Sequence, residues 1–314
     1  MAERPTRQVA VSRRIAVLDA PSNLGLRPPA PGVVPGCYKL AGALRDQGLV
    51  ARLKARDAGY VTPPRYDRQD WKLGDGVANA AGIAAYTVRL ADRIGPLVAD
   101  GEFAVVLGGD CSIALGTMLA LRRRGRFGLA FLDGHSDFRH PGNSPGVGAA
   151  AGEDLALVTG RGQADLTNVE GLTPYVRDAD VAVIGIRDAD EYLAELRTLR
   201  IPTWPVRDLR GAGAAGTATL ALSHLERDDL DGFWIHLDAD ILDPSAMPAV
   251  DSPDPGGLQL EELTTILRTL VGSSRSVGLE MTVFDPDLDP DGQLAAMLTD
   301  ALIDAVEAGF QIRH

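Results

Sequence analysis

Residues of types that bind divalent cations are concentrated in two short motifs, Asp-Gly-His-Ser-Asp and Asp-Ala-Asp. They are Asp133, His135, Asp137, Asp238 and Asp240. Each motif follows an apolar run that is typical of a buried strand, so both should lie at the carboxyl ends of strands. Because side chains alternate along an extended chain, the first, third and fifth residues of one motif can share a face, as can both aspartates of the other.

Four carboxylates gathered in one place would repel each other and would be costly to bury without positive charge. Oxygen ligands with one imidazole suit ions such as Mn²⁺, and this number of carboxylates suits two ions that share ligands. A single D-x-D motif could equally be the cap of a strand end. The occurrence of both motifs therefore favours a metal site.

The elements that must position these motifs are strands alternating with helices. The apolar runs predict strands at 14–19, 51–55, 103–107, 128–132, 181–186, 201–206, 233–237 and 276–281. The segments between them predict helices at 36–47, 76–99, 112–124, 189–200, 214–227, 260–272 and 292–308. Such alternation favours a mostly parallel sheet with helices on both faces. Sites in open sheets of this kind form beyond the carboxyl ends of the strands, where the motifs are expected.

A third motif, GGDCS at residues 108–112, also follows an apolar run. Its glycine pair lacks the pattern of a phosphate-binding loop and predicts a close approach of two backbones. Taken in order, the motifs GGDCS, LDGHSD and LDADILDP resemble those of the ureohydrolase family, which includes arginase, agmatinase and formiminoglutamase. The resemblance extends to residues 244–257 and 277–281, and it spans residues 13–310.

The resemblance implies an arginase-like, three-layer α/β/α fold whose central sheet holds the eight strands above. It implies a hydrolase of C–N bonds in linear amidines, in which a hydroxide between two ions attacks a small guanidino or formimino substrate. One ion would be held by Cys111, Asp133, Asp137 and Asp238. The other would be held by Asp133, His135, Asp238 and Asp240. Asp137 could also accept and pass on a proton.

The same resemblance makes two manganese ions per chain the expected cofactor, while the sulfur of Cys111 leaves zinc, iron, cobalt or nickel open. Family members are commonly trimers or hexamers, which implies a homo-oligomer here.

Three positions depart from the family pattern. Cys111 stands where the family has a histidine ligand, and residues 150–154 lack the histidine that the family uses in proton transfer. By spacing, Val283 occupies the place of the glutamate that binds a guanidinium in arginase and agmatinase. A thiolate would add negative charge, which suits a substrate with a better leaving group, such as an N-hydroxyguanidine or a formimino group. The departures also leave open a non-catalytic or regulatory homologue with a retained metal site.

Five further residues are candidates for the chemistry. His140 could replace the proton-transfer histidine, or it could be a solvated loop residue. Arg139 could bind a substrate carboxylate, or it could be a surface charge. Glu153 and Asp154 could supply an anionic partner for the substrate, although acids also suit a first helical turn. His236 could face the site, but its strand position favours a hydrogen-bonded core histidine.

Length and composition limit the classes of fold, partner and location that this chain can have. The 314 residues include 45% hydrophobic residues, which is enough for a large core. A net charge of −12 argues against a nucleic-acid partner, and no apolar run is long enough to span a membrane. Two cysteines make no disulfide framework, and no secretory signal is visible, so a cytoplasmic setting is expected. We expect a flexible arm at residues 1–12 and one catalytic domain at residues 13–314.

Overall fold

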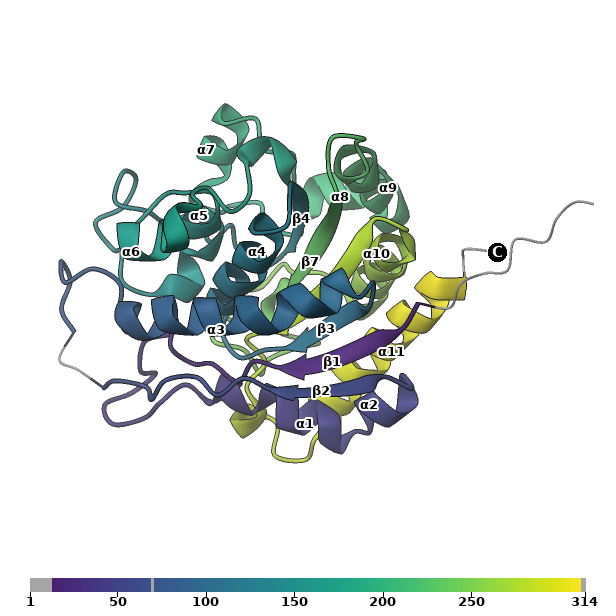
Figure 1. Ribbon diagram of the computed structural model, residues 1–314, viewed down its shortest axis with the longest axis horizontal. Coiled ribbons are helices and arrows are strands. Elements are labelled where there is room, and N and C mark those ends of the chain that lie inside the picture. The colour runs from purple at the N-terminus through teal and green to yellow at the C-terminus, as the bar shows by residue number, and fades with distance from the viewer. Residues whose placement is uncertain (1–12, 69–70, 312–314) are drawn as a thin grey trace, which may run out of the picture.

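A computed structural model of the chain describes residues 13–68 and 71–311 (Figure 1). Its centre is one sheet of eight strands in the order β2-β1-β3-β8-β7-β4-β5-β6, and all neighbouring pairs are parallel. The strands are β1 (Ile15–Asp19), β2 (Arg56–Tyr60), β3 (Phe103–Leu107), β4 (Phe127–Leu132), β5 (Val181–Ile184), β6 (Thr203–Trp204), β7 (Gly232–Asp238) and β8 (Ser276–Thr282). The predicted parallel sheet is confirmed.

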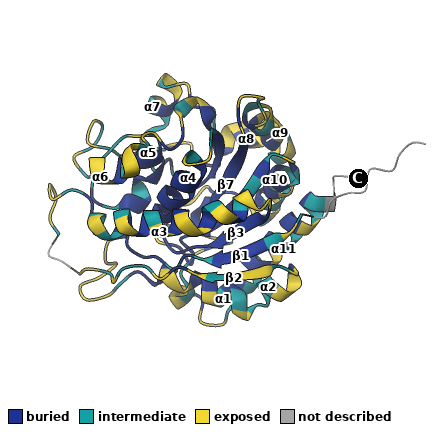
Figure 2. Ribbon diagram, viewed as in Figure 1, coloured by how far each residue is buried: buried dark blue, intermediate teal, exposed yellow. Residues whose placement is uncertain are grey.

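Helices cover both faces of this sheet. They are α1 (Leu40–Asp46), α2 (Leu49–Arg52), α3 (Ala80–Ala99), α4 (Ala114–Arg122), α5 (Asp154–Val158), α6 (Ala164–Thr167), α7 (Leu193–Thr198), α8 (Val206–Ala212), α9 (Ala214–Leu225), α10 (Leu260–Gly272) and α11 (Gln293–Gln311). The central strands lie in the buried interior, and exposed residues lie along the outer sides of the helices (Figure 2).

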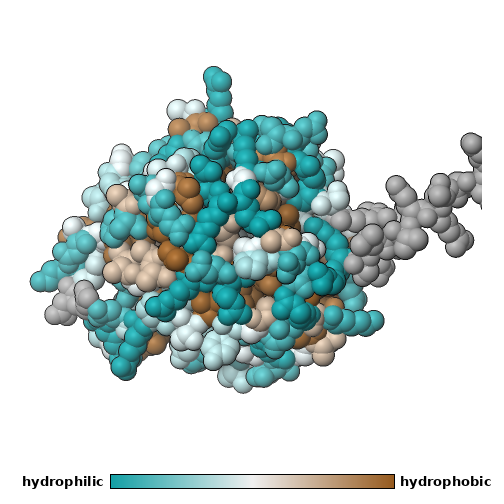
Figure 3. Space-filling model, in the orientation of Figure 1, coloured by the Kyte–Doolittle hydropathy of each residue, from teal (hydrophilic) through white to brown (hydrophobic). Residues whose placement is uncertain are grey.

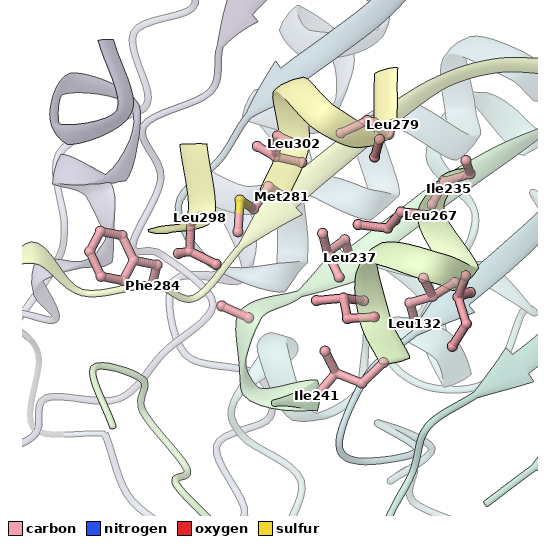
Figure 4. Close-up of a cluster of buried hydrophobic side chains, with 14 of the residues drawn as sticks. Leu132, Ile235, Leu237, Ile241, Leu267, Leu279, Met281, Phe284, Leu298 and Leu302 are labelled. Atoms are coloured by element: carbon pink, nitrogen blue, oxygen red, sulfur yellow. The ribbon is translucent and has the colours of Figure 1, made fainter. Parts of the chain in front are cut away.

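Alternation along the strands divides the interior into two hydrophobic layers. On β3, Val105 and Leu107 face the layer formed with α1, α9, α10 and α11, while Ala104 and Val106 face the layer formed with α3 and α4. Figure 4 shows part of the first layer, where side chains of β7 and β8 meet those of α10 and α11. Both faces of the sheet are therefore buried, which confirms the three-layer α/β/α architecture.

Helix α10 illustrates how the sequence specifies this layering. Leu263, Ile266, Leu267 and Leu270 are buried at the spacing of one helical face. The helix begins at a capping box in which Gln259 and Glu262 satisfy each other's backbone N–H groups. Its apolar face packs on α11 and α9, so local capping and the hydrophobic pattern agree on the same arrangement.

The strand order explains how motifs distant in sequence come together. The strands that precede the three motifs are β3, β4 and β7, and the sheet order β3-β8-β7-β4 places them side by side around β8. Because all of these strands are parallel, their carboxyl ends meet at one edge of the sheet. The GGDCS, LDGHSD and LDADILDP segments are thus neighbours in space.

One predicted strand is wrong. Residues 51–55 fall in helix α2 and the turn after it, and the strand begins only at Arg56. Gly48, in the left-handed conformation with φ of 77°, ends one helix and begins the next, so the apolar residues after it continue a helix. Strand β2 lies at the sheet edge and is largely exposed, and it therefore lacks the apolar pattern that marks the other strands.

The remaining differences are in the lengths of two elements and in three short helices that the sequence pattern does not reveal. The predicted helix at 189–200 shortens to α7, the strand at 201–206 shortens to β6, and α5, α6 and α8 were not predicted. The surface in Figure 3 is mainly hydrophilic, with apolar residues in small patches. Among the helices that the structure describes, none is long and apolar enough to cross a membrane. The predicted arm at residues 1–12 lies outside the described residues.

Candidate metal centre

A cavity of about 1120 Å³ lies at the carboxyl edge of the sheet. His135, Asp137, Asp238 and Asp240 line it, and Val283, which follows β8, lines it as well. The side chains come from the loops after β4, β7 and β8, as the strand order requires.

The two acidic motifs use the same local turn. The Asp133 carboxylate accepts the N–H of His135 at 2.6 Å, and the Asp238 carboxylate accepts the N–H of Asp240 at 2.7 Å. In each motif the first aspartate thereby caps the turn that carries the third residue. Each aspartate uses its Oδ1 for this hydrogen bond, so its Oδ2 remains available for another partner. The repeated D-x-(H/D) spacing is therefore a positioning device as well as a set of ligands.

His135 joins the two motifs. Its Nδ1 lies 2.9 Å from Asp240 Oδ2, and its Nε2 lies 3.1 Å from Asp254 Oδ2. The N–H of Gly134 donates to the other Asp240 oxygen at 3.1 Å. Burial alone would lower the pKa of His135, but Asp240 and the other carboxylates raise it to about 11. The carboxylates of the two motifs thus stabilise the positively charged form of this imidazole.

Cys111 lies at the start of the short helical turn before α4 and is fully buried. Its thiol donates to Asp238 Oδ2 at 2.8 Å and lies 3.0 Å from the Thr282 hydroxyl. Burial, followed by the charge of Asp238, raises the pKa of this thiol well above its usual range. The Cys111–Asp238 pair therefore joins the GGDCS motif to the second acidic motif, which His135 joins to the first.

The carboxylates of the cluster are held in an environment that opposes their ionisation. Burial raises the pKa of Asp133, Asp137, Asp154 and Asp238 well above the ordinary value, and neighbouring carboxylates raise it further. Asp240 is the exception: burial raises its pKa, but the hydrogen bond and charge of His135, the N–H of Gly134 and the charge of Arg187 together lower it. A cluster of this kind needs protons or cations to be stable.

Divalent cations fit the donor atoms present. Two groups of ligand atoms each lie within 4.8 Å of one another, and Asp133 belongs to both. The first group is Cys111, Asp133 and His236, and the second is Asp133, His135 and Asp240. Within the described part of the chain, Asp133 Oδ2, both Asp154 oxygens and His236 Nε2 are buried without a hydrogen-bond partner. Buried polar atoms of native proteins are rarely unsatisfied, so a cation is a natural partner for them.

Asp137 and Asp154 lie against each other at the edge of this cluster. Asp137 has φ of 42°, a conformation that costs energy for a residue other than glycine. Asp154 opens helix α5 but is fully buried, and its charge is the main electrostatic influence on Asp137. The site thus contains one carboxylate more than the two motifs supply.

The other predicted site residues are placed differently. Arg139 lines the cavity and hydrogen-bonds Tyr192, which also lines it. Glu153 is buried and accepts the N–H groups of Gly148 and Ala149 at 2.6 and 3.1 Å. His140 lies 3.1 Å from Glu195, and neither His140 nor Glu153 is among the described residues that line the cavity.

Sequence reasoning missed Arg187, a buried residue just after β5. Its guanidinium donates to the backbone carbonyls of Asp240, Ile241, Leu242 and Asp254. It thereby holds the loop that carries the second acidic motif. The sequence did offer one signal: Arg187 is a polar residue directly after a predicted strand. Residues in that position lie at the same edge of the sheet as the motifs that follow the neighbouring strands.

Comparisons with known proteins agree with this geometry. The family model described as "Arginase family" matches residues 16–306. The chain belongs to the arginase family. It is 32% identical over 264 residues to an arginase of Brevibacillus brevis, covering 81% of this chain and 86% of that protein. The native structure of the Bacillus caldovelox arginase, 27% identical, superposes with a TM-score of 0.84, covering 94% and 98% of the two chains.

A Bacillus subtilis arginase is also similar, at 27% identity over 302 residues, which cover 93% of this chain and 98% of that protein. This arginase-family chain is accordingly a hydrolase of the class that acts on amidino C–N bonds.

The structure shows what surrounds the positions where this arginase-family chain departs from the usual pattern. Ala151 and Gly152 line the cavity in the segment that lacks the family's histidine. Val283 lines it with φ of 71°, an outlier for a β-branched residue, and its N–H donates to the Gly109 carbonyl at 2.7 Å. A Cβ on Gly109 would lie 1.7 Å from the Ser22 carbonyl oxygen, which confirms the close backbone approach predicted for the glycine pair.

Proposed function

We propose that this protein is a binuclear metal-dependent hydrolase that cleaves a C–N bond of a small guanidino- or formimino-type substrate. The observation that carries the proposal is the pair of ligand groups that share Asp133 beside a cavity large enough for an amino-acid-sized molecule. The candidate ligands are Cys111, Asp133, His135, Asp137, Asp238 and Asp240.

Two divalent ions, manganese first and zinc, iron, cobalt or nickel as alternatives, would polarise water so that it ionises near neutral pH. Asp133, which belongs to both groups of ligand atoms, would help to hold the two ions; its Oδ1 accepts the His135 N–H and its Oδ2 has no hydrogen-bond partner. Asp238 is a further proposed ligand, with its Oδ1 held by the Asp240 N–H and its Oδ2 beside Cys111.

Proton handling is proposed for Asp137. Its carboxylate faces the cavity beside the other candidate ligands, where it could accept a proton from the attacking water and pass it to a leaving amine. Asp154 is fully buried and is not among the described residues that line the cavity, so we assign it to positioning Asp137 and not to contacting the substrate. Arg139, which faces the cavity beside Tyr192, is the residue proposed to bind a substrate carboxylate.

Substrate choice is proposed to follow from Val283. The resemblance places the guanidinium-binding glutamate of arginase and agmatinase at this position, where the present chain has an apolar side chain lining the cavity. Arginine and agmatine should therefore be poor substrates. N-hydroxyguanidine or formimino compounds, which have a better leaving group or a more electrophilic carbon, should be better ones.

A product-release assay tests this proposal. Metal-loaded protein is incubated with arginine, agmatine, guanidinobutyrate, hydroxyarginine and formiminoglutamate, and urea, ammonia and amine products are quantified. Turnover of at least one of them, abolished in Asp238→Asn and retained in the exposed control Asp165→Asn, is expected. No turnover of any of them under manganese, zinc, iron, cobalt or nickel would favour the non-catalytic homologue. The homo-oligomeric state, trimer or hexamer, and a cytoplasmic location stay predictions.

A further inference from the structure

His236 lies in the middle of the candidate site, on a strand that the acidic motif follows. It is fully buried on β7, two residues before Asp238. Its ring stacks on Phe131 of β4, with centroids 4.8 Å apart and planes inclined by 9°. The ring is thus fixed between neighbouring strands, and its two nitrogens have very different surroundings.

One ring nitrogen, Nδ1, has a hydrogen-bond partner. His236 Nδ1 lies 2.8 Å from Glu280 Oε1 on the neighbouring strand β8. The other oxygen of Glu280 accepts the hydroxyl of Thr117 at 2.5 Å. With the Glu280 carboxylate as the acceptor of this contact, Nδ1 is the donor nitrogen of the ring. The lone pair of the neutral imidazole is therefore on Nε2.

The other nitrogen has no partner. His236 Nε2 is buried without a hydrogen bond, and the nearest carboxylate oxygen, Asp154 Oδ2, is 3.8 Å away. That distance is too long for a hydrogen bond, so among the described residues Nε2 has no hydrogen-bond partner. Nε2, Cys111 Sγ and an Asp133 oxygen do lie within 4.8 Å of one another, which is the spacing of ligands around one ion.

We propose that His236 Nε2 is a ligand of the ion held by Cys111 and Asp133, with Glu280 as the residue that fixes its tautomer and orientation. This inference rests on the proposed metal centre. A metal-binding histidine usually donates its second N–H to a carboxylate, and His236 has such a partner in Glu280. Most buried side-chain nitrogens in native proteins have a partner, whereas His236 Nε2 has none among the described residues.

The assignment also gives the two proposed ions similar sets of ligands. The second ion already has the imidazole of His135, whereas the first would otherwise have only sulfur and carboxylate ligands. A second neutral nitrogen adds coordination without adding negative charge to a cluster whose carboxylates already resist ionisation. Each ion then has one imidazole and a share of Asp133.

Metal counting tests the proposal with readouts independent of turnover. The parent, His236→Gln, Glu280→Gln and the control His224→Gln, which lies on α9 beside Arg227, are loaded with Zn²⁺, desalted and analysed for zinc per chain. We expect two ions in the parent and in His224→Gln, and one in His236→Gln. Glu280→Gln should bind the same ion about 10- to 100-fold more weakly, the usual effect of losing such a partner.

The parent protein supplies a measurement that does not depend on a variant folding. In crystals of the zinc-loaded parent, an anomalous peak should lie about 2.0–2.1 Å from His236 Nε2. Two ions in the parent with neither near Nε2, or two ions retained at unchanged affinity in His236→Gln, would overturn the inference and leave the binuclear proposal standing. A single ion bound to Nε2 would support the inference and contradict the binuclear proposal, and a parent that binds no ion would overturn both.

Discussion

Arg187 should be a main determinant of the stability of the metal-binding loop. Its guanidinium donates to four backbone carbonyls of the segment after β7. The Ile241 carbonyl also accepts the N–H of Leu258, and Asp254 is exposed, so these two carbonyls keep a partner or gain water when the guanidinium is removed. The carbonyls of Asp240 and Leu242 are buried and would lose the donor that Arg187 provides.

The expected cost follows from those two buried acceptors. Hydrogen bonds from a charged donor contribute about 1.5–3 kcal/mol each, but a single nitrogen serves both carbonyls, at 2.9 and 3.2 Å, so the lower end of the range applies. Arg187→Met should therefore lower the free energy of unfolding by about 3 kcal/mol. Arg187→Lys should lose part of this, because an ammonium keeps the charge but cannot reach several acceptors in a fixed plane.

Urea unfolding of the metal-free protein measures this effect without a contribution from metal binding. The matched control is Arg207→Met, an 82% exposed arginine in a single long ion pair with Asp188, for which a change near zero is expected. The same Arg187→Met protein should bind metal more weakly at Asp240. If Arg187→Met unfolds at the same urea concentration as Arg207→Met, the guanidinium does not hold the loop and the reasoning is refuted.

Three further predictions concern specificity, pH and the thiol. Val283→Glu should raise kcat/KM for arginine by about ten- to a hundred-fold relative to Val283→Gln, because it restores a charge-assisted hydrogen bond; equal values would show that the position does not face the guanidinium. Asp243 has its pKa lowered from 3.8 to about 2 by hydrogen bonds from Ser245 and Gly256. Its stabilising effect is full above the ordinary pKa and is lost as the pH falls towards the folded value, so the difference in urea midpoint between the parent and Asp243→Asn should shrink between about pH 5 and pH 3; a constant difference would contradict this. Cys111→Ala should lose one ion, and Cys111→His should keep two and shift preference towards Mn²⁺, as elemental analysis after competition would show; full occupancy in Cys111→Ala would place the thiol off the metal.

Much of the fold could be predicted because its signals are local. The runs before residues 108 and 133 are apolar throughout, and the run before residue 238 is interrupted only by His236, a pattern typical of strands buried on both faces. Strand β2 could not be found in this way, since an exposed edge strand carries no such run. The apolar residues 49–51 before it belong to helix α2 instead.

The site could be predicted to the extent that its residues lie within motifs. The D-x-(H/D) turns depend on contacts two residues apart, so sequence spacing reveals them. Arg187, His236 and Asp154 depend on contacts between strands or loops far apart in the chain, and no spacing rule marks them. His236 shows the difficulty most clearly, because a histidine in an apolar strand fits a core residue as well as a ligand until its neighbours are known.

The number of metal ions per chain is the most direct test of the central claim, that two ions share the carboxylates of this site. Purified parent protein, Asp133→Asn, Asp238→Asn and the exposed control Asp165→Asn are loaded with Mn²⁺ or Zn²⁺, desalted and subjected to elemental analysis. The account predicts two ions per chain in the parent and in the control, and at most one in each of the other variants. Two ions retained in both Asp133→Asn and Asp238→Asn would contradict it.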